Sequence, residues 1–224
     1  DLDTTSYKWT HYTLLEKFRE GEAQILLGTQ MIAKGLDFPN VTLTGVISAD
    51  IGLNLPDFRA AERTFQLLTQ IAGRTGRGKI KGEVVIQTYS PQEKSILYAS
   101  QHDYEGFYQE EIKERKLYFY PPFIRLALVG LSGKEESRVK RAAQIWLAHL
   151  KDYLNENKLT NEIFLLGPAP APLSKIKGRY RWQIAIKSKK AKELHLLLNE
   201  VGRQLQNLDR KIKVSLDIDP IDML

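Results

Sequence analysis

The sequence contains no cysteine, and its four histidines are scattered among 224 residues. A chain without cysteine can form no disulfide bond and no thiolate metal site. Scattered histidines do not supply the cluster of ligands that zinc requires. The composition therefore predicts no metal site in this chain. It leaves the redox state of the compartment open, and an intracellular setting fits it best.

Several longer features are also absent. No apolar run approaches the roughly 18 residues that a membrane span needs, and no signal peptide is visible, so we expect no membrane association. No G-x-x-x-x-G-K-[ST] sequence occurs, so the chain lacks a cradle for the β- and γ-phosphates of a nucleotide. An acidic magnesium motif of the Walker B type is missing as well. The chain opens at Asp1 rather than at methionine, and we expect a fragment or a processed piece.

The charge that is present is positive and unevenly distributed. The chain has 33 Lys and Arg against 27 Asp and Glu, a net charge of +6. Between Pro168 and Lys213 there are twelve basic residues against three acidic ones. Such a skew predicts a nucleic-acid-binding face. The alternative is a basic surface that serves only solubility.

In the first half, short apolar runs alternate with amphipathic segments. The expected helices are Tyr7–Glu20, Ala60–Ile71 and a long one from Ser90 to about Lys116, and the expected strands are Ala23–Leu27, Val41–Ser48 and Gly82–Thr88. This alternation predicts an α/β fold with a parallel sheet covered by helices on both faces. Ligands bind such sheets beyond the carboxyl ends of the strands.

Two glycine-bearing stretches lie where a ligand could reach them. In Gln70–Gly78, Arg74 and Arg77 each adjoin glycine, and the planar guanidinium fork matches phosphate oxygens. The alternative is a glycine-rich turn with two solvated arginines. In the second stretch, Gly28–Pro39, Thr29 comes directly after a predicted strand. A lysine, a glycine and an aspartate then follow within four residues: Lys34, Gly35 and Asp37. These residues could hold a phosphate and a ribose, or could belong to an ordinary strand–helix–strand crossover.

The second half begins at two consecutive prolines, Pro121 and Pro122, which cannot continue a helix. We place the domain boundary there, with domains 1–117 and 118–224. The expected elements are strands Ile124–Ser132, Ile163–Leu166, Arg179–Lys187 and Lys213–Ile218, helices Lys134–Glu156 and Ala191–Gln206, and a stiff connector Gly167–Pro172. The order β-α-β-β-α-β predicts a small α+β domain of the ferredoxin-like kind.

The densest basic and aromatic cluster is SKIKGRYRW, from Ser174 to Trp182. Because alternate residues of a strand point to opposite faces, Tyr180 and Trp182 are predicted to face the core rather than to stack on bases. The cations remain as candidates for binding phosphates: Lys175, Lys177, Arg179 and Arg181.

Taken together, these stretches resemble a known family. The Gly28–Pro39 and Gln70–Gly78 segments resemble motifs V and VI of the second RecA-like lobe of superfamily 2 helicases, and the whole is most similar to the bacterial replication-restart helicases. The resemblance extends from about Gly21 onward and is carried by LLGTQMIAKGLDFPNVTL, DFRAAERTFQLLTQIAGRTGRG, GEVVIQT, YPPFIRLALVGLSG and LDIDPIDML. It implies a RecA-like helicase lobe over 1–117 and a DNA- and partner-binding domain over 118–224.

The resemblance implies a role for each matching position. Arg77 would be the arginine finger that reaches the γ-phosphate of ATP, with Arg74 and Gln70 supporting it. The nucleotide edge would be formed by Gly35, Asp37, Gly73 and Gly76. Thr29 and Lys34 would contact the DNA strand, although Lys34 replaces the arginine common at that position and lacks its bidentate fork.

The resemblance also implies cofactors and partners. ATP and Mg²⁺ would be shared with a first lobe that this chain lacks, and zinc would belong only to an upstream cysteine-rich module. The implied partners are branched and single-stranded DNA, single-strand-binding protein and other primosome proteins, in the bacterial cytoplasm. The competing hypothesis is a non-catalytic scaffold that binds nucleic acid or protein. A small-ligand α/β enzyme is disfavoured because we find no nucleophile paired with a base.

Overall fold

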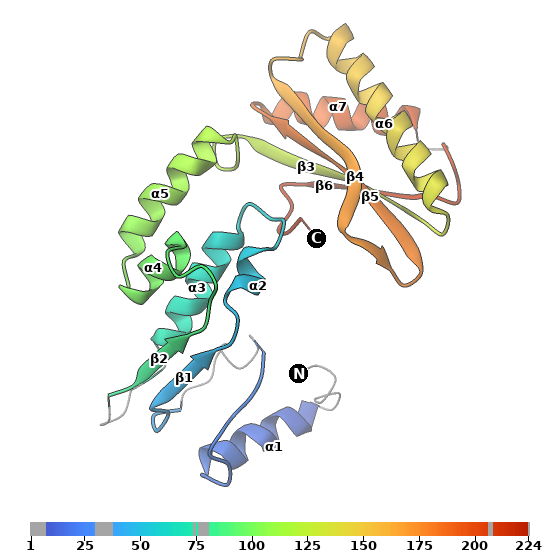
Figure 1. The fold of residues 1–224 in the computed structure, drawn as a ribbon. Coiled ribbons are helices and arrows are strands. Elements are labelled where there is room, and N and C mark those ends of the chain that lie inside the picture. The colour runs from blue at the N-terminus through green and yellow to red at the C-terminus, as the bar shows by residue number, and fades with distance from the viewer. Residues whose placement is uncertain (1–7, 30–37, 74, 76–80, 206–207, 224) are drawn as a thin grey trace. The chain divides into compact units, whose positions relative to one another are not determined.

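The computed structural model describes residues 8–29, 38–73, 75, 81–205 and 208–223 (Figure 1). The chain forms two compact units, Asp1–Leu55 with Arg59–Tyr108, and Pro56–Phe58 with Gln109–Leu224. Helix α5, Tyr104–Leu117, contributes residues to both units. The predicted boundary between residues 117 and 118 follows the last residue of this helix, whereas the two units divide within it, between Tyr108 and Gln109. The domain assignment stays a prediction.

The first unit contains a small parallel sheet and several helices. Its elements are α1 (Lys8–Arg19), β1 (Leu43–Val46), α2 (Asp50–Leu53), α3 (Ala60–Ala72), β2 (Glu83–Ile86), α4 (Lys94–Ser100) and the start of α5. Strands β1 and β2 pair in parallel, with Leu43 opposite Glu83 and Val46 opposite Ile86. The predicted parallel pairing is therefore confirmed for these two strands.

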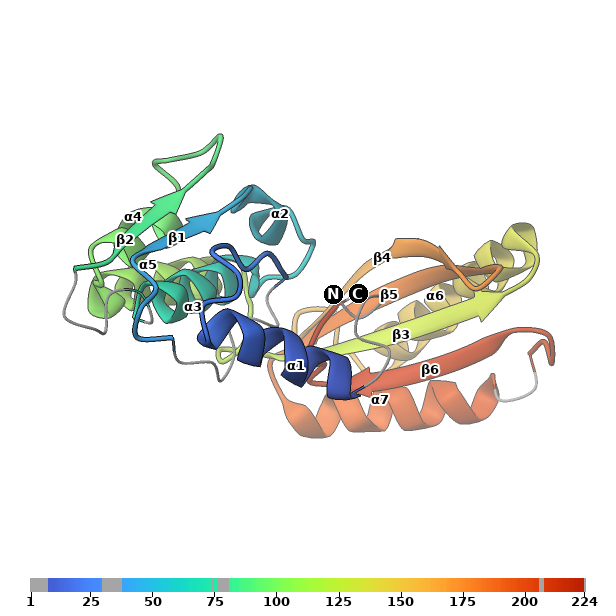
Figure 2. The ribbon, with the colours of Figure 1, turned by 90° about the horizontal axis from the view of Figure 1, so that it is seen from below.

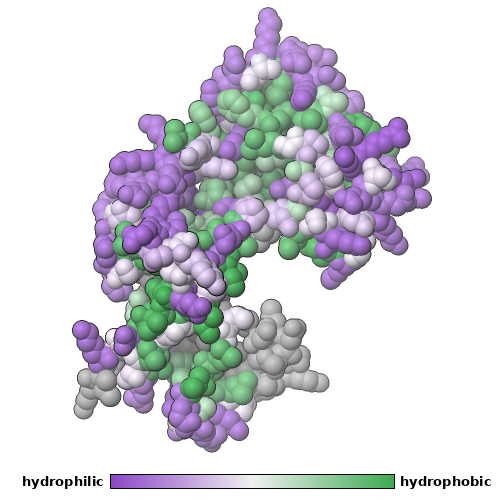
Figure 3. All heavy atoms as spheres, in the orientation of Figure 1, coloured by the Kyte–Doolittle hydropathy of each residue, from purple (hydrophilic) through white to green (hydrophobic). Residues whose placement is uncertain are grey.

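One face of this sheet packs on a hydrophobic core. Val46 and Ile86 contact a cluster in which the rings of Phe65 on α3 and Phe107 on α5 stack with centroids 4.3 Å apart. The other face of the described sheet is exposed, and Leu43 and Val85 lie on it. Hydrophobic side chains gather over this part of the surface in Figure 3. The prediction of a sheet covered on both faces is therefore wrong for the described residues.

The segment Ala23–Leu27 is not a strand, contrary to the prediction. It has no regular structure, and Ile25 and Leu27 are 84% and 82% exposed. A parallel strand is stable when a neighbour takes its hydrogen bonds and helices cover its faces. In the described part of the chain β1 pairs with β2 alone. The Ala23–Leu27 run therefore has, among those residues, neither a neighbouring strand nor a helix that covers it.

The long helix expected from Ser90 to Lys116 is interrupted. Helix α4 ends at Ser100, α5 starts at Tyr104, and His102 between them has φ of 55°. The Asp103 carboxylate accepts a hydrogen bond of 2.8 Å from the Gly106 amide. An aspartate in this position satisfies a free amide of a helix start, which explains why a new helix begins here.

The second unit has the element order predicted for it. Strand β3 (Arg125–Gly133) is followed by α6 (Glu136–Glu156), β4 (Ile163–Ile176), β5 (Arg179–Ser188), α7 (Ala191–Gln204) and β6 (Lys213–Ile218). The strands form one antiparallel sheet in the order β4-β5-β3-β6. Helices α6 and α7 lie beside each other on one face of it (Figure 2).

The helix-covered face of this sheet carries the core of the unit. Tyr180 and Trp182 pack against that core together with the fully buried Ile184 and Ile186. The prediction that these two aromatic side chains face the core is confirmed. The intervening residues of β5, including Arg181, therefore lie on the face that the helices leave open.

Strand β4 is longer than predicted, because the segment expected to be a connector belongs to it. The pairing of β4 with β5 shifts register between Leu166 and Ala169 and again between Pro170 and Lys175. Proline removes a ladder hydrogen bond and is tolerated at bulges and on edge strands. Strand β4 is at the edge of the sheet, so its prolines fit there.

Candidate nucleotide and nucleic-acid sites

The described part of the predicted nucleotide site is the end of α3. Gln70 lies half-buried in the last turn of this helix, and Gly73 follows it. The Gly73 amide donates to the carbonyl oxygen of Thr69 at 2.9 Å. The other predicted members of this site, together with Lys34, lie outside the described residues: Gly35, Asp37, Arg74, Gly76 and Arg77.

The backbone conformation at position 73 does not require glycine. Its φ of −68° and ψ of −5° are open to any residue. A Cβ built at this position would meet its nearest neighbour, the Thr69 carbonyl oxygen, at an ordinary 3.4 Å. What the glycine provides is an exposed backbone without a side chain, which lets another group approach closely.

Thr75, shortly after α3, is hydrogen-bonded both to that helix and to strand β1. Its hydroxyl donates to the Ile71 carbonyl oxygen at 3.3 Å and lies 2.8 Å from the hydroxyl of Thr44 on β1. Since the Thr75 proton is used on Ile71, Thr44 donates in the second hydrogen bond. Thr75 is absent from the predicted site. The signal for it in the sequence is a hydroxyl residue between two arginines.

Asp50 organises the carboxyl ends of both parallel strands. Its carboxylate, just after β1, accepts from the Tyr89 amide at 3.1 Å and from the Thr88 hydroxyl at 3.0 Å, both just after β2. Desolvation acts to raise the pKa of Asp50, but the hydrogen bonds from Tyr89 and Thr88 outweigh it, and the pKa lies below its ordinary value. The carboxylate is therefore used to hold the strand ends.

Among the residues predicted to bind DNA, Thr29 is exposed in a segment without regular structure. The basic cluster forms the β4–β5 hairpin, whose turn residues Lys177 and Gly178 have φ of 48° and 74°. Positive φ at both central residues is typical of a tight hairpin turn. Lys177 is exposed at the tip, where it can meet a ligand.

The three other predicted cations of the hairpin are held by the protein itself. Lys175 donates to the Tyr180 hydroxyl at 3.3 Å, and its Nζ lies 4.5 Å from the centre of that ring. Arg179 donates to the Ser132 carbonyl oxygen at 2.9 Å, and Arg181 to the Leu173 carbonyl oxygen at 3.4 Å. These contacts fix the directions in which the charges point.

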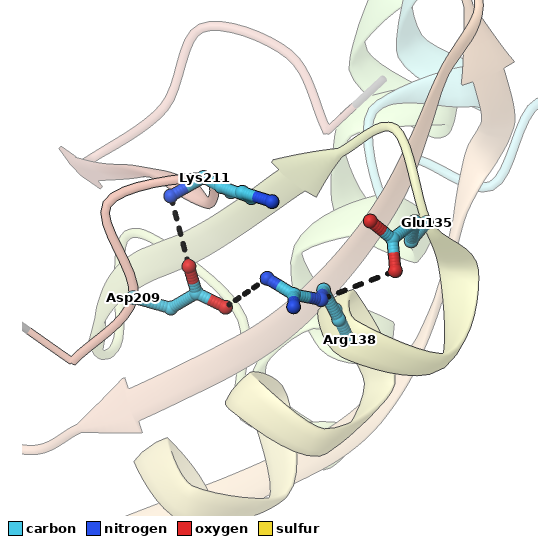
Figure 4. A network of polar contacts seen from close by, with 4 residues as sticks. All are labelled: Glu135, Arg138, Asp209 and Lys211. Atoms are coloured by element: carbon cyan, nitrogen blue, oxygen red, sulfur yellow. Dashed lines mark hydrogen bonds and ion pairs between the residues drawn. The ribbon is translucent and has the colours of Figure 1, made fainter.

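A cleft at the end of the sheet gathers five cations that sequence reasoning missed around the predicted Arg179. It has a volume of about 500 Å³, and its basic lining residues are Lys134, Arg138, Arg179, Arg210, Lys211 and Lys213. A polar network, Glu135–Arg138–Asp209–Lys211, runs along one wall (Figure 4). The run from 210 to 213 contributes to the basic skew in the sequence, but nothing local connects it with Lys134 or Arg138.

No group of three or more His, Asp or Glu side chains could hold a metal ion in the part of the chain that the structure describes. In that same part, no helix combines the length and apolar character that crossing a membrane requires.

Comparison with known proteins agrees with both halves of this description. The family described as "Helicase conserved C-terminal domain" matches residues 10–79, and the "Primosomal protein N C-terminal domain" matches residues 116–221. The replication restart protein PriA of Bacillus subtilis (strain 168) is 48% identical over all of this chain. The proteins of the same name from Synechocystis and Chlamydia muridarum are 40% and 41% identical over 100% and 99% of it.

This chain belongs to the PriA family. The two domain matches occur in the same order as the two units, and the relatives match along the whole chain. The chain spans less than a third of these PriA relatives, at 28%, 26% and 29% of their lengths. Among solved structures, a de novo designed protein, Foldit4, covers 43% of the chain at 14% identity with a TM-score of 0.34, too low for an argument about fold.

Proposed function

We propose that this chain is the carboxyl-terminal part of an ATP-dependent DNA helicase that moves 3′ to 5′, recognises stalled or branched replication forks and restarts replication by primosome assembly. The observation that carries the proposal is the match to PriA relatives along the whole chain at 36–48% identity. The name replication restart protein describes those relatives. Its transfer to this chain is part of the proposal.

In this proposal the first unit is the second RecA-like lobe of the helicase and the second is a ferredoxin-like domain. The parallel pairing of β1 and β2, with α3 leading into the two-arginine segment, supports the first assignment. The β-α-β-β-α-β order and the strand order β4-β5-β3-β6 support the second.

The nucleotide site would be completed by another lobe. Gln70 and Gly73 alone do not hold a triphosphate, so no hydrolytic step follows from the described geometry. Arg77 as arginine finger, Arg74, Gly35, Asp37 and Gly76 are proposed from their places in the motifs. ATP and Mg²⁺ would bind between the lobes, and zinc would belong to an upstream module.

The partners proposed for the second unit are branched and single-stranded DNA, single-strand-binding protein and other primosome proteins, encountered in the bacterial cytoplasm. Support comes from the exposed cations of the β4–β5 hairpin and the cleft. In the first unit, Thr29 and Lys34 would contact the translocating strand.

The test is the substitution Arg77→Ala in a protein that joins this chain to the amino-terminal remainder found in its relatives. An arginine finger stabilises charge that develops on the transferred phosphoryl group, so its loss should lower DNA-stimulated ATP turnover by about 10³-fold or more. Binding of single-stranded DNA should remain within about twofold, because DNA contacts lie elsewhere.

Lys81→Ala serves as a control, since it removes a cation beyond the motif. If Arg77→Ala left turnover at the level of this control, the motor assignment would be wrong. The scaffold alternative, in which the chain only binds nucleic acid or protein, would then be favoured.

A further inference from the structure

The basic cleft is assembled by the sheet from distant parts of the sequence. In the register, Ser132 of β3 lies opposite Arg181 of β5 on one side and Lys213 of β6 on the other. This pairing brings the end of β3, with Lys134 just after it, beside the starts of the other two strands. Six cations line the cleft. Among the described residues that line it Glu135 is the acidic one, and Asp209 pairs with Arg138 beside it, so these eight residues carry a formal excess of four positive charges.

Arg138 stabilises the wall of this cleft through two ion pairs, which use its charge within the protein. Its Nε lies 3.1 Å from a carboxylate oxygen of Glu135, and its Nη1 lies 3.5 Å from one of Asp209 (Figure 4). Asp209 also accepts a hydrogen bond of 2.9 Å from the backbone amide of Lys211. The network therefore links the start of α6 to the turn before β6 along one wall of the cleft.

The other charges of the cleft are available. Arg179 uses one of its N–H groups on the Ser132 carbonyl oxygen, and a guanidinium has five. Among the described residues, the side chains of Lys134, Arg210, Lys211 and Lys213 form no hydrogen bond or ion pair with the protein. Cations that repel one another and lack partners cost folding free energy, so an anionic ligand would relieve an unfavourable arrangement.

The lining indicates which anion fits. Ile212 is the single apolar residue among those that line the cleft, and no aromatic ring is among them. Binding by base stacking needs such rings, whereas lysine and arginine side chains read phosphate oxygens without regard to sequence. Arg179 belongs both to the cleft and to the hairpin that carries Lys177, so positive charge continues beyond the cleft along the β4–β5 hairpin.

We propose that this cleft is a sequence-independent seat for the phosphodiester backbone of a single nucleic-acid strand, which then passes over Arg179 toward the hairpin tip. The inference rests on the proposed function only in taking nucleic acid as the substrate. It names Lys134, Arg210, Lys211 and Lys213 as the binding residues, none of which the motifs of the first unit supply.

The test compares two double variants of the whole chain. Lys211→Gln with Lys213→Gln removes two charges from the cleft. Lys151→Gln with Lys192→Gln removes two exposed charges from α6 and α7, outside the cleft. Binding of a fluorescent 20-nucleotide oligothymidylate is measured by anisotropy from low to high salt, together with an abasic strand of equal length. Thermal unfolding checks whether both variants are folded.

The cleft variant should bind the strand roughly tenfold more weakly at low salt, and its salt slope should fall by about 1.4 for two lost phosphate contacts. The abasic strand should show the same loss, because the bases are not read. The control variant should change affinity by less than about twofold, since dispersed charges add little. If the cleft variant unfolds, Lys134→Gln with Arg210→Gln replaces it.

Equal binding by the cleft and control variants would overturn the proposal. Competition with tripolyphosphate and with polyglutamate separates the other occupants. If either bound the chain and lost affinity in the cleft variant while oligothymidylate binding stayed unchanged, the cleft would serve a compact polyphosphate or an acidic peptide, and the proposal would be wrong. None of these results depends on ATP turnover, so failure here would leave the motor assignment untouched.

Discussion

Lys187 is a buried lysine of β5 whose side chain has no carboxylate partner among the described residues. It is 8% exposed, its Nζ donates to the Tyr118 carbonyl oxygen at 2.9 Å, and it lies 3.6 Å from the centre of the Tyr120 ring. The Tyr120 ring also stacks on Phe58 at 4.9 Å. The lysine thus ties the segment after α5 to the sheet by one hydrogen bond and one cation–π contact.

Burial lowers the pKa of Lys187 below its ordinary 10.5. Between the folded pKa and 10.5 the unfolded chain therefore holds more protons than the folded one, so the free energy of unfolding should rise with pH across this window and be flat below it. Lys187→Met should remove that rise. Urea unfolding at several alkaline pH values, followed by the fluorescence of Trp146 and Trp182, measures the difference.

The exposed Lys192→Met is the control for this titration, and it should keep the alkaline rise of the unsubstituted chain. The difference between the two variants isolates the contribution of Lys187 to the alkaline rise. An equal slope in the Lys187→Met and Lys192→Met variants would show that burial of Lys187 does not act on stability.

At this same scale, the sequence predicts residues whose role depends on neighbours along the chain and misses those whose role depends on topology. The alternation of β5 places Tyr180 and Trp182 in contact with the core correctly, because strand periodicity is local. Lys134 is brought to the cleft only through the pairing of Ser132 with Lys213. Thr75 is likewise joined to Thr44 across 31 positions, a contact without a local signal.

At the scale of elements, the break between α4 and α5 departs from the continuous helix that the sequence predicts. Gly106, in the first turn of α5, donates its amide to Asp103, and this carboxylate also occupies the space where a side chain would be. A Cβ at Gly106 would lie 2.3 Å from an Asp103 carboxylate oxygen and 2.5 Å from Cε1 of Tyr98. Both distances are far below van der Waals contact.

Gly106→Ala should therefore destabilise the first unit by about 1–3 kcal/mol, because the added methyl displaces the capping carboxylate or the tyrosine ring. Urea unfolding measures the change. Gly45→Ala on β1 is the matched control, since nothing lies within 4 Å of a Cβ built there. A Gly106→Ala protein as stable as this control would mean that the cap and the ring move aside without cost.

Helices and strands could be predicted where the residue pattern alone determines them. They could not be predicted where the structure depends on pairing with another strand. Helix α3 and strand β6 follow their patterns closely. The apolar run Ala23–Leu27 has the composition of a buried strand. Strand formation also requires a neighbouring strand, and the sequence of the segment itself does not show whether one is present. Strand β4 shows the opposite case, because its edge position allows prolines that read as a connector.

For the molecule as a whole, the two units carry different kinds of unsatisfied surface. The first unit exposes apolar side chains over its two-stranded sheet, including Leu43, Ile47 and Val85. The second exposes unpaired cations in its cleft. Exposed apolar patches mark surfaces that bind other protein, and unpaired cations mark surfaces that bind anions. These two surfaces suit the chain to binding, and in the proposed function the rest of the nucleotide site would come from another lobe.

This division predicts the behaviour of the isolated chain. Without a phosphate cradle of the G-x-x-x-x-G-K-[ST] kind, it should show no DNA-stimulated ATP hydrolysis above background, because positioning and charge stabilisation of the triphosphate both require that cradle. It should still bind oligothymidylate, with an affinity that falls steeply as salt rises. A coupled phosphate-release assay and anisotropy on the same preparation measure the two properties. Turnover at about 1 per second or faster, typical of enzymes, would refute the proposed division between lobes.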